Sequence, residues 1–177
     1  MGEAASANQY WRQSLATWAI PEALIAAAPA SPYFFDPQAF ITAADEALAR
    51  SDDTVSDRIA REALAGGSSV LDVGVGAGAA SLRLSPGRVM GVDPRRVMLD
   101  AFAARAAQLG VPHEEVEGSW PDVAGVALAA DVAVCHHVGY SVADLAQIDA
   151  PMSCQGLMWG SLFQHADGLC HRHGPGE

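Results

Sequence analysis

The chain contains no lysine: all ten of its basic residues are arginines, and acidic residues outnumber them at 21. The formal charge at pH 7 is −11, and no basic run occurs that could follow a phosphate backbone. This charge pattern disfavours a long nucleic acid as a partner and leaves small molecules as the favoured class of ligand.

Cysteine and long apolar runs are also scarce. Cys135, Cys154 and Cys170 form neither an even set nor a CxxC pair, so we expect no disulfide framework and a reducing compartment. No apolar run approaches the roughly 18 to 20 residues of a membrane-spanning helix, and no signal-peptide pattern occurs. We therefore expect a cytoplasmic protein without a membrane partner, and the Ala-, Gly- and Arg-rich composition suggests a bacterial source.

The most informative stretch is VLDVGVGAG at residues 70–78, a short apolar run followed by three alternating glycines. It predicts a buried strand and a turn whose missing side chains let a nucleotide approach the backbone. Asp72 precedes the first glycine by two residues, where we expect its carboxylate to project into the cleft. A carboxylate there repels a pyrophosphate and attracts a cationic group, which favours S-adenosylmethionine over NAD.

Helical patterns fill the first 65 residues. Trp11, Leu15 and Trp18 share one helical face, which is typical of core packing, although a lid over the ligand remains the alternative. A second short helix follows Pro21, and Asp36-Pro37 is a strong start signal for a third. A fourth is expected from Asp52 or Asp53. We interpret residues 1–65 as a helical cap that packs on the sheet.

From residue 66 strands and helices alternate, which predicts right-handed crossovers and a mostly parallel, doubly wound α/β sheet of the Rossmann-like class. The core is predicted to span residues 66–147, and its ligand site should lie at the carboxyl ends of the strands. The expected strands are 70–74, 88–92, 114–117 and 131–136, with helices at about 78–84 and 95–109.

Asp93 ends the second predicted strand, 19 positions after Gly74. A carboxylate at this place can accept hydrogen bonds from both hydroxyls of a ribose, because the second strand ends beside the glycine turn. Asp93 can also cap the helix that begins near Pro94 and Arg95, and the two roles can coexist.

Asp72 to Gly78 together with Asp93 resemble the first motif and the ribose-binding acid of class I S-adenosylmethionine-dependent methyltransferases. The resemblance covers roughly residues 65–147. It implies that S-adenosylmethionine is the cofactor and that the adenine lies beside the residues after the third strand. The cofactor-binding residues implied are Asp72, Gly74, Val75, Gly76, Gly78, Asp93, Pro94, Gly118, Ser119, Trp120 and His136.

The same resemblance places the methyl acceptor beside the segment that follows the fourth strand, where Tyr140 is the expected substrate contact. His136 and His137 are the candidate catalytic residues, because a neutral imidazole there can take a proton from an acceptor hydroxyl or amine. Lining of the site and plain packing are the alternatives. Trp120 and Tyr140 are interpreted as an aromatic wall or as core residues, and Cys135 as a core thiol.

The composition changes after Gln147, and residues 148–177 form an atypical tail. His165, Cys170, His171 and His173 are legitimate zinc ligand types, but their spacing matches no known finger, so we expect no metal site. No clear strand is recognisable in the tail, which predicts a sheet that ends near His136. An uncovered fourth strand would favour self-association along that edge, and a homo-oligomer is therefore a possible state.

The sequence thus predicts methyl transfer from S-adenosylmethionine to a small-molecule acceptor. The first alternative is an inactive or cofactor-binding-only methyltransferase remnant, which the atypical tail favours. The second is an NAD(P)-dependent oxidoreductase, because dehydrogenases also use glycine-rich turns.

Overall fold

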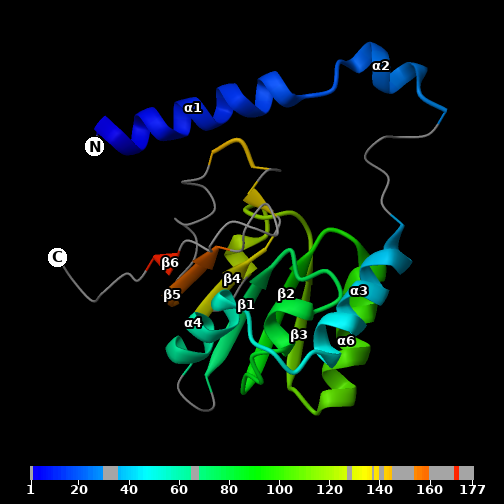
Figure 1. Cartoon of the computed structure of the whole chain (residues 1–177), viewed down its shortest axis with the longest axis vertical. Helices are drawn as coiled ribbons and strands as arrows, with labels where there is room; N and C mark the ends of the chain where they lie inside the picture. The colour runs from blue at the N-terminus through cyan, green and yellow to red at the C-terminus, as the bar shows by residue number, and fades with distance from the viewer. Residues whose placement is uncertain are drawn as a thin grey trace.

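The computed structural model describes residues 2–29, 36–64, 68–126, 129–136, 138–139, 142–144, 154–159 and 170–171. Helices come first along the chain, and a single sheet with helices on it follows (Figure 1). This order confirms the predicted α/β class with preceding helices. No helix in these ranges is long and apolar enough to cross a membrane.

The sheet has six strands in the order β3-β2-β1-β4-β5-β6. All neighbouring strands are parallel except β5 and β6. The strands are β1 (Ser69–Val73), β2 (Arg88–Asp93), β3 (His113–Glu117), β4 (Ala130–Cys135), β5 (Cys154–Trp159) and β6 (Cys170–His171). The four predicted strands are therefore confirmed to within one residue at each end.

The helices are α1 (Gly2–Trp18), α2 (Glu22–Ala27), α3 (Pro37–Ala49), α4 (Val55–Ala63), α5 (Ala79–Leu82) and α6 (Arg96–Leu109), with a 3₁₀ turn, η1, at Ala124–Val126. Asp36 caps α3 as predicted, because its side chain accepts a hydrogen bond from the Gln38 N–H. The α4 cap is Thr54, which forms a capping box with Asp57. The predicted start at Asp52 or Asp53 is thus one to two residues early.

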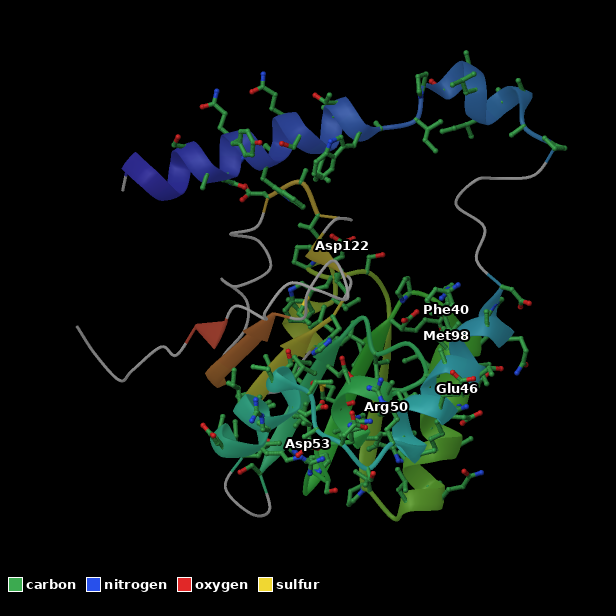
Figure 2. The ribbon with its side chains drawn as sticks, viewed as in Figure 1. Phe40, Glu46, Arg50, Asp53, Met98 and Asp122 are labelled. Atoms are coloured by element: carbon green, nitrogen blue, oxygen red, sulfur yellow. The ribbon has the colours of Figure 1, made fainter. Side chains whose placement is uncertain are left out.

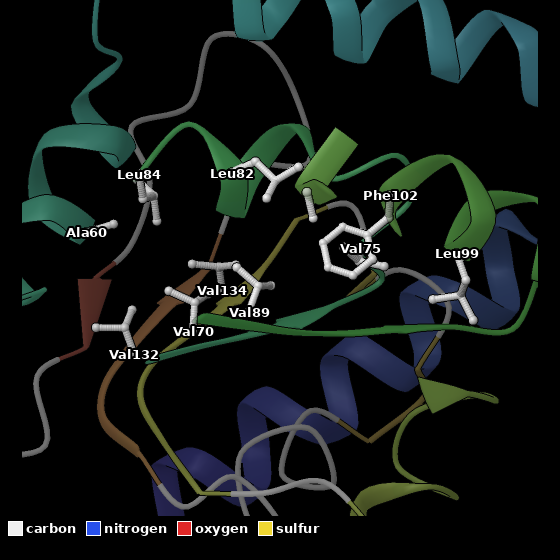
Figure 3. Packing of buried hydrophobic residues seen from close by; sticks show 11 residues of the cluster. Ala60, Val70, Val75, Leu82, Leu84, Val89, Leu99, Phe102, Val132 and Val134 are labelled. Atoms are coloured by element: carbon white, nitrogen blue, oxygen red, sulfur yellow. The ribbon is translucent and has the colours of Figure 1, made fainter. Parts of the chain in front are cut away.

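Each face of the sheet has its own apolar cluster. On one face, alternate strand residues such as Val70, Val89 and Val134 pack against Phe102 of α6 and Leu82 of α5 (Figure 3). The opposite face holds Leu71, Val73, Met90, Val92, Ala133 and Cys135, which pack with Trp120 and Val142. Cys135 is 1% exposed and packs in this second cluster, which confirms its interpretation as a core thiol.

Two buried arginines tie the preceding helices to the sheet layer. Arg105 of α6 donates to the Asp45 carboxylate at 2.8 Å from Nε and to the Ile41 carbonyl at 3.0 Å from Nη2. Arg83 donates to the Asp52 carbonyl at 2.6 Å and to the Asp57 carboxylate at 3.2 Å. α3 contacts α5 and α6, whereas α4 packs on the sheet beside β4 and β5.

The prediction that the sheet ends near His136 is wrong. β5 pairs in parallel with β4 from Ala130↔Cys154 to Cys135↔Trp159, and β6 pairs with β5. The tail therefore gives β4 a partner on its second edge. The segment was not recognised because Gly156 and Met158 weaken the strand signal of CQGLMW, while a neighbouring strand supplies the pairing.

The core role expected for the aromatic face of α1 is also wrong for Trp18, which is 67% exposed. α1 lies apart from the sheet, on the side of the segment that follows β4 (Figure 1). Trp18 makes an edge-to-face contact with Trp11 within the same helix. The spacing of apolar residues along a helix does not show which element packs on them. In this structure α1 lies apart from the sheet and the helices packed on it (Figure 1).

Candidate functional site

The strand order reverses between β1 and β4, which are neighbours although β2 and β3 lie between them in sequence. After β1 the chain continues to β2 on one side of the sheet, and after β4 it continues to β5 on the other side. The loops that follow β1 and β4 therefore run in opposite directions. Ligands of open α/β sheets bind in the crevice that such a switch point creates at the carboxyl ends of the strands. The glycine turn after β1 lies at this point.

The glycine turn is held by backbone hydrogen bonds. The N–H groups of Gly74 and Val75 both donate to the Val92 carbonyl of β2, at 2.8 and 2.9 Å, and the Gly78 N–H donates to the Val75 carbonyl at 2.8 Å. Gly74, Gly76 and Gly78 have φ values of 73°, 52° and 86°. This is the left-handed region, where glycine is favoured over any residue with a Cβ.

The three glycines meet different surroundings. A Cβ built on Gly74 would lie 2.2 Å from Cγ2 of Val138, and one on Gly78 would lie 2.7 Å from Cδ1 of Leu82. A Cβ on Gly76 has no atom within 4 Å. Gly74 and Gly78 are therefore needed for close packing inside the protein, whereas Gly76 presents bare backbone to open space, as a ligand cradle requires.

Asp93 connects the glycine turn to the end of β2. Its Oδ2 accepts a hydrogen bond from the Gly76 N–H at 3.1 Å, and its Oδ1 accepts one from the Arg95 N–H at 2.9 Å. The backbone carbonyl of Asp93 accepts from the Gly118 N–H at 3.1 Å, which brings the end of β3 to the same place. The capping role predicted for Asp93 is wrong, because the N-cap of α6 is Arg95 and no side chain caps this helix; Asp93 only fixes the turn before it. Each carboxylate oxygen keeps a second lone pair for a ligand.

Arg95 also faces the outer helices. Its guanidinium lies 5.5 Å from the centroid of the Phe40 ring, within cation–π distance. Figure 2 labels Phe40 on α3 and Met98 on α6, two helices that contact each other. α3 therefore supports this edge of the site.

Asp72 lies inside the protein rather than at the surface of the cleft. It is 1% exposed, and no donor in the described residues meets full hydrogen-bond geometry at either carboxylate oxygen, although Ser81 lies close by. Burial raises the pKa of this carboxyl to about 7; the nearby Ser81 opposes the rise and the Asp93 charge adds to it. The Ser81 hydroxyl is itself buried and unpartnered. The pair of unsatisfied groups on β1 and α5 was not predicted, because only the fold brings Ser81 to Asp72.

The structure places the other predicted site residues differently from one another. Trp120 is 7% exposed and packs in the second apolar cluster, so its indole is a core residue here. His136 directly follows β4, and its carbonyl lies 3.9 Å from the Cβ position of Gly74. His137 and Tyr140 lie outside the described residues. Val138, which the sequence did not single out, covers Gly74.

Within the described ranges, no group of three or more His, Cys, Asp or Glu side chains could hold a metal ion. Cys170 and His171 belong to β6, whereas His165 and His173 lie outside those ranges. The expectation that the chain has no metal site therefore stays a prediction.

Residues 70–152 match the model of the methyltransferase domain family. The matched residues are therefore similar to a methyltransferase domain. The match covers the glycine turn, Asp93, and β1 to β4, and it confirms the resemblance on which the sequence prediction rested. None of the curated proteins matches the chain.

Solved structures show the same fold. A SAM-dependent methyltransferase from Aquifex aeolicus has a TM-score of 0.52 at 20% identity, with 71% of this chain and 71% of that chain covered. A SAM-dependent methyltransferase from Thiobacillus denitrificans, in complex with S-adenosyl-L-homocysteine, has a TM-score of 0.50 at 21% identity and covers 71% and 55%. TehB from Haemophilus influenzae has a TM-score of 0.52 at 16% identity, and the chain spans 41% of its length.

Proposed function

We propose that the chain binds S-adenosylmethionine at the Gly74 to Gly78 turn and transfers its methyl group to a small-molecule acceptor. One observation carries the proposal. Gly76 has no atom within 4 Å of its Cβ position, although its N–H is held at 3.1 Å by Asp93. This fixed and uncovered backbone fits the close approach of a nucleoside.

The residues present fit the cofactor's functional groups. Asp93 has free lone pairs on both carboxylate oxygens, which suit the two hydroxyls of a ribose. Asp72 lies on β1 two residues before the turn, and its negative charge suits the ammonium group of an amino acid once the ligand displaces the cover over this buried carboxylate. Burial already disfavours the ionised form of Asp72, and a pyrophosphate beside it would add a second negative charge. The position of Asp72 therefore disfavours NAD as the ligand.

S-adenosylmethionine supplies an electrophilic methyl group on a sulfonium, so correct positioning of the acceptor accounts for much of the rate. We propose His136 as a candidate base, because it follows β4 beside the glycine turn. The net charge of −11 supports a small-molecule acceptor over tRNA or DNA. A cytoplasmic location remains part of this proposal, on the pattern of the three cysteines.

Calorimetric titration of the purified chain with S-adenosylhomocysteine and with NAD tests the cofactor. We expect heat with S-adenosylhomocysteine only, and heat with NAD only would contradict the proposal. Asp93→Ala should weaken binding by about 1.5 to 3 kcal/mol, because charge-assisted hydrogen bonds are lost. Asp100→Ala is the matched control: Asp100 forms an exposed ion pair with Arg96 on α6 at 2.8 Å, away from the turn.

Incubation of metabolite extracts with a methyl-labelled cofactor tests the acceptor class. We expect label in small molecules. Label mainly in nucleic acid would contradict the substrate class, and cofactor binding without label transfer to any acceptor would favour the cofactor-binding-only alternative.

A further inference from the structure

The N-terminal helix α1 contacts the segment that follows β4. The Asn8 Nδ2 donates to Asp144 Oδ1 at 2.6 Å, and the Arg12 guanidinium donates to Asp144 Oδ2 at 3.0 Å. Between them, the Trp11 Nε1 donates to the Val142 carbonyl at 3.0 Å. Residues 8, 11 and 12 are neighbours on one face of a helix, so this face of α1 is aligned with residues 142–144.

The contacted segment also touches the cofactor turn. Val142 is 7% exposed and packs in the second apolar cluster with Trp120 and Cys135. Val138, a few residues earlier, covers Gly74, since a Cβ on Gly74 would lie 2.2 Å from its Cγ2. Val138 packs against the same cluster, and the Val142 N–H donates to the Gly139 carbonyl at 3.3 Å, so this segment links α1 to the glycine turn.

The described part of α1 buries little of its surface. None of its residues from 6 to 18 is buried, and Trp18 is 67% exposed. A single exposed ion pair contributes little by itself, so docking of α1 depends on the three contacts acting together. Such an element, with few buried apolar groups, responds to small changes in the segment beneath it.

We propose that Asn8, Trp11 and Arg12 are positioning residues, which hold the segment of Val138 and residues 142–144 against the glycine turn and so couple cofactor binding to docking of α1. This inference rests on the proposed function, because it takes S-adenosylmethionine as the ligand of the turn. The coupling is reciprocal: a ligand that orders the turn and Val138 stabilises the docked helix, and the docked helix favours the ligand.

Asp144 offers the sharpest test, because it accepts hydrogen bonds from both Asn8 and Arg12. Asp144→Asn keeps the size of the side chain, removes its charge and replaces one acceptor oxygen by a donor. Asp100→Asn is the control, since it removes one exposed ion pair on α6 without touching α1 or the turn. Circular dichroism establishes that both variants are folded.

Hydrogen exchange of the native full chain, with and without S-adenosylhomocysteine, provides a readout that needs no variant. We expect the ligand to slow exchange both at residues 74–78 and in α1. Slower exchange at 74–78 with no change in α1 would overturn the coupling while leaving the cofactor proposal intact. No change in either place would overturn both.

For the variants, we expect Asp144→Asn to weaken S-adenosylhomocysteine binding by about fivefold or more, at the lower end of typical coupling between sites. α1 should also lose its ligand-dependent protection. Asp100→Asn should bind as the native chain does. Equal affinity of the native chain and Asp144→Asn would overturn the inference.

Discussion

Gly76 and Gly110 share a backbone conformation and differ in location. Their φ values are 52° and 69°, and neither has an atom within 4 Å of its Cβ position. Gly76 lies in the glycine turn after β1, whereas Gly110 is the C-cap of α6. Alanine at either position carries the energetic cost of a left-handed backbone, and only alanine at Gly76 would also take up space proposed for a ligand. Comparing the two variants therefore separates these effects.

We expect Gly76→Ala and Gly110→Ala each to lower the free energy of unfolding by about 1 kcal/mol, because alanine is strained at positive φ. Only Gly76→Ala should also weaken S-adenosylhomocysteine binding, by about tenfold or more, since its methyl group occupies the ligand's space. Urea unfolding and calorimetric titration provide the two measurements. Equal ligand affinity of the two variants would contradict the assignment of Gly76 to the site.

Asp72 links stability to pH. Its folded pKa of about 7 lies above the ordinary value of 3.8, so the folded protein binds the extra proton between these values. Stability from this group is therefore full below pH 3.8, falls as pH rises toward 7, and stays low above it. The physical cause is an ionised carboxylate that is buried without a partner.

Asp72→Asn should therefore stabilise the ligand-free protein more at pH 8 than at pH 5.5. The difference between the two stabilisation values should be on the order of 2 kcal/mol, because about 1.5 pH units of titration lie between pH 5.5 and the folded pKa. Urea unfolding of both proteins at each pH measures it. A stabilisation that does not change with pH would show that Asp72 does not titrate in this range.

The affinity for the ligand should depend on pH in the opposite direction to the stability of the ligand-free protein. S-adenosylhomocysteine affinity should rise as pH increases through about 7, since its ammonium group pairs with the ionised Asp72 carboxylate. Asp72→Asn should bind weakly and without this pH dependence. Titrations from pH 6 to 8 test the pairing, and a parallel pH profile in the variant would contradict it.

Among the elements, α3 and α4 are held to the sheet layer through arginines. The Arg105 side chain is 11% exposed and bonds to Asp45, Ile41 and Ala101, whereas the Asp45 side chain is 63% exposed. Arg105 thus forms an ion pair with Asp45 and donates to the carbonyls of Ile41 and Ala101, whereas Asp45 contributes to this set only through the ion pair.

Arg105→Ala should lower the free energy of unfolding by about 1.5 to 3 kcal/mol, because it removes a largely buried guanidinium with its charged hydrogen bonds to partly buried carbonyls of α3 and α6. Asp45→Ala should cost about 1 kcal/mol or less, since its carboxylate is largely in water. Urea unfolding measures both values. Equal losses would show that the exposed ion pair, rather than the buried carbonyl contacts, holds α3.

The elements also show what the sequence can and cannot predict. Strand β1, the glycine turn and Asp93 were predictable because local signals coincide there: an apolar run, alternating glycines and an acid at the next strand end. β5 was missed because its stability depends on pairing with β4, which a local pattern does not contain. The burial of Asp72 beside Ser81 and the cover of Val138 over Gly74 depend likewise on the assembled fold.

At the scale of the whole molecule, the tail completes a sheet that the sequence left open. β5 lies between β4 and β6: β4 pairs along its length, and β6 pairs with it at Leu157 and Met158. We expect amides of residues 154–159 to exchange with solvent much more slowly than those of α2, which has no buried residue. Fast exchange throughout β5 would restore the prediction of an incomplete sheet and of self-association along β4.

The central claim is that the crevice at the carboxyl ends of β1 and β4 holds S-adenosylmethionine. Chemical-shift mapping of the native chain by NMR during titration with S-adenosylhomocysteine tests this claim residue by residue. The account predicts that the largest shifts fall on the amides of Gly74, Gly76, Gly78 and Arg95, at the turn and around Asp93. Shifts confined to the opposite ends of the strands, around Ser69, Arg88 and Glu114, would contradict it.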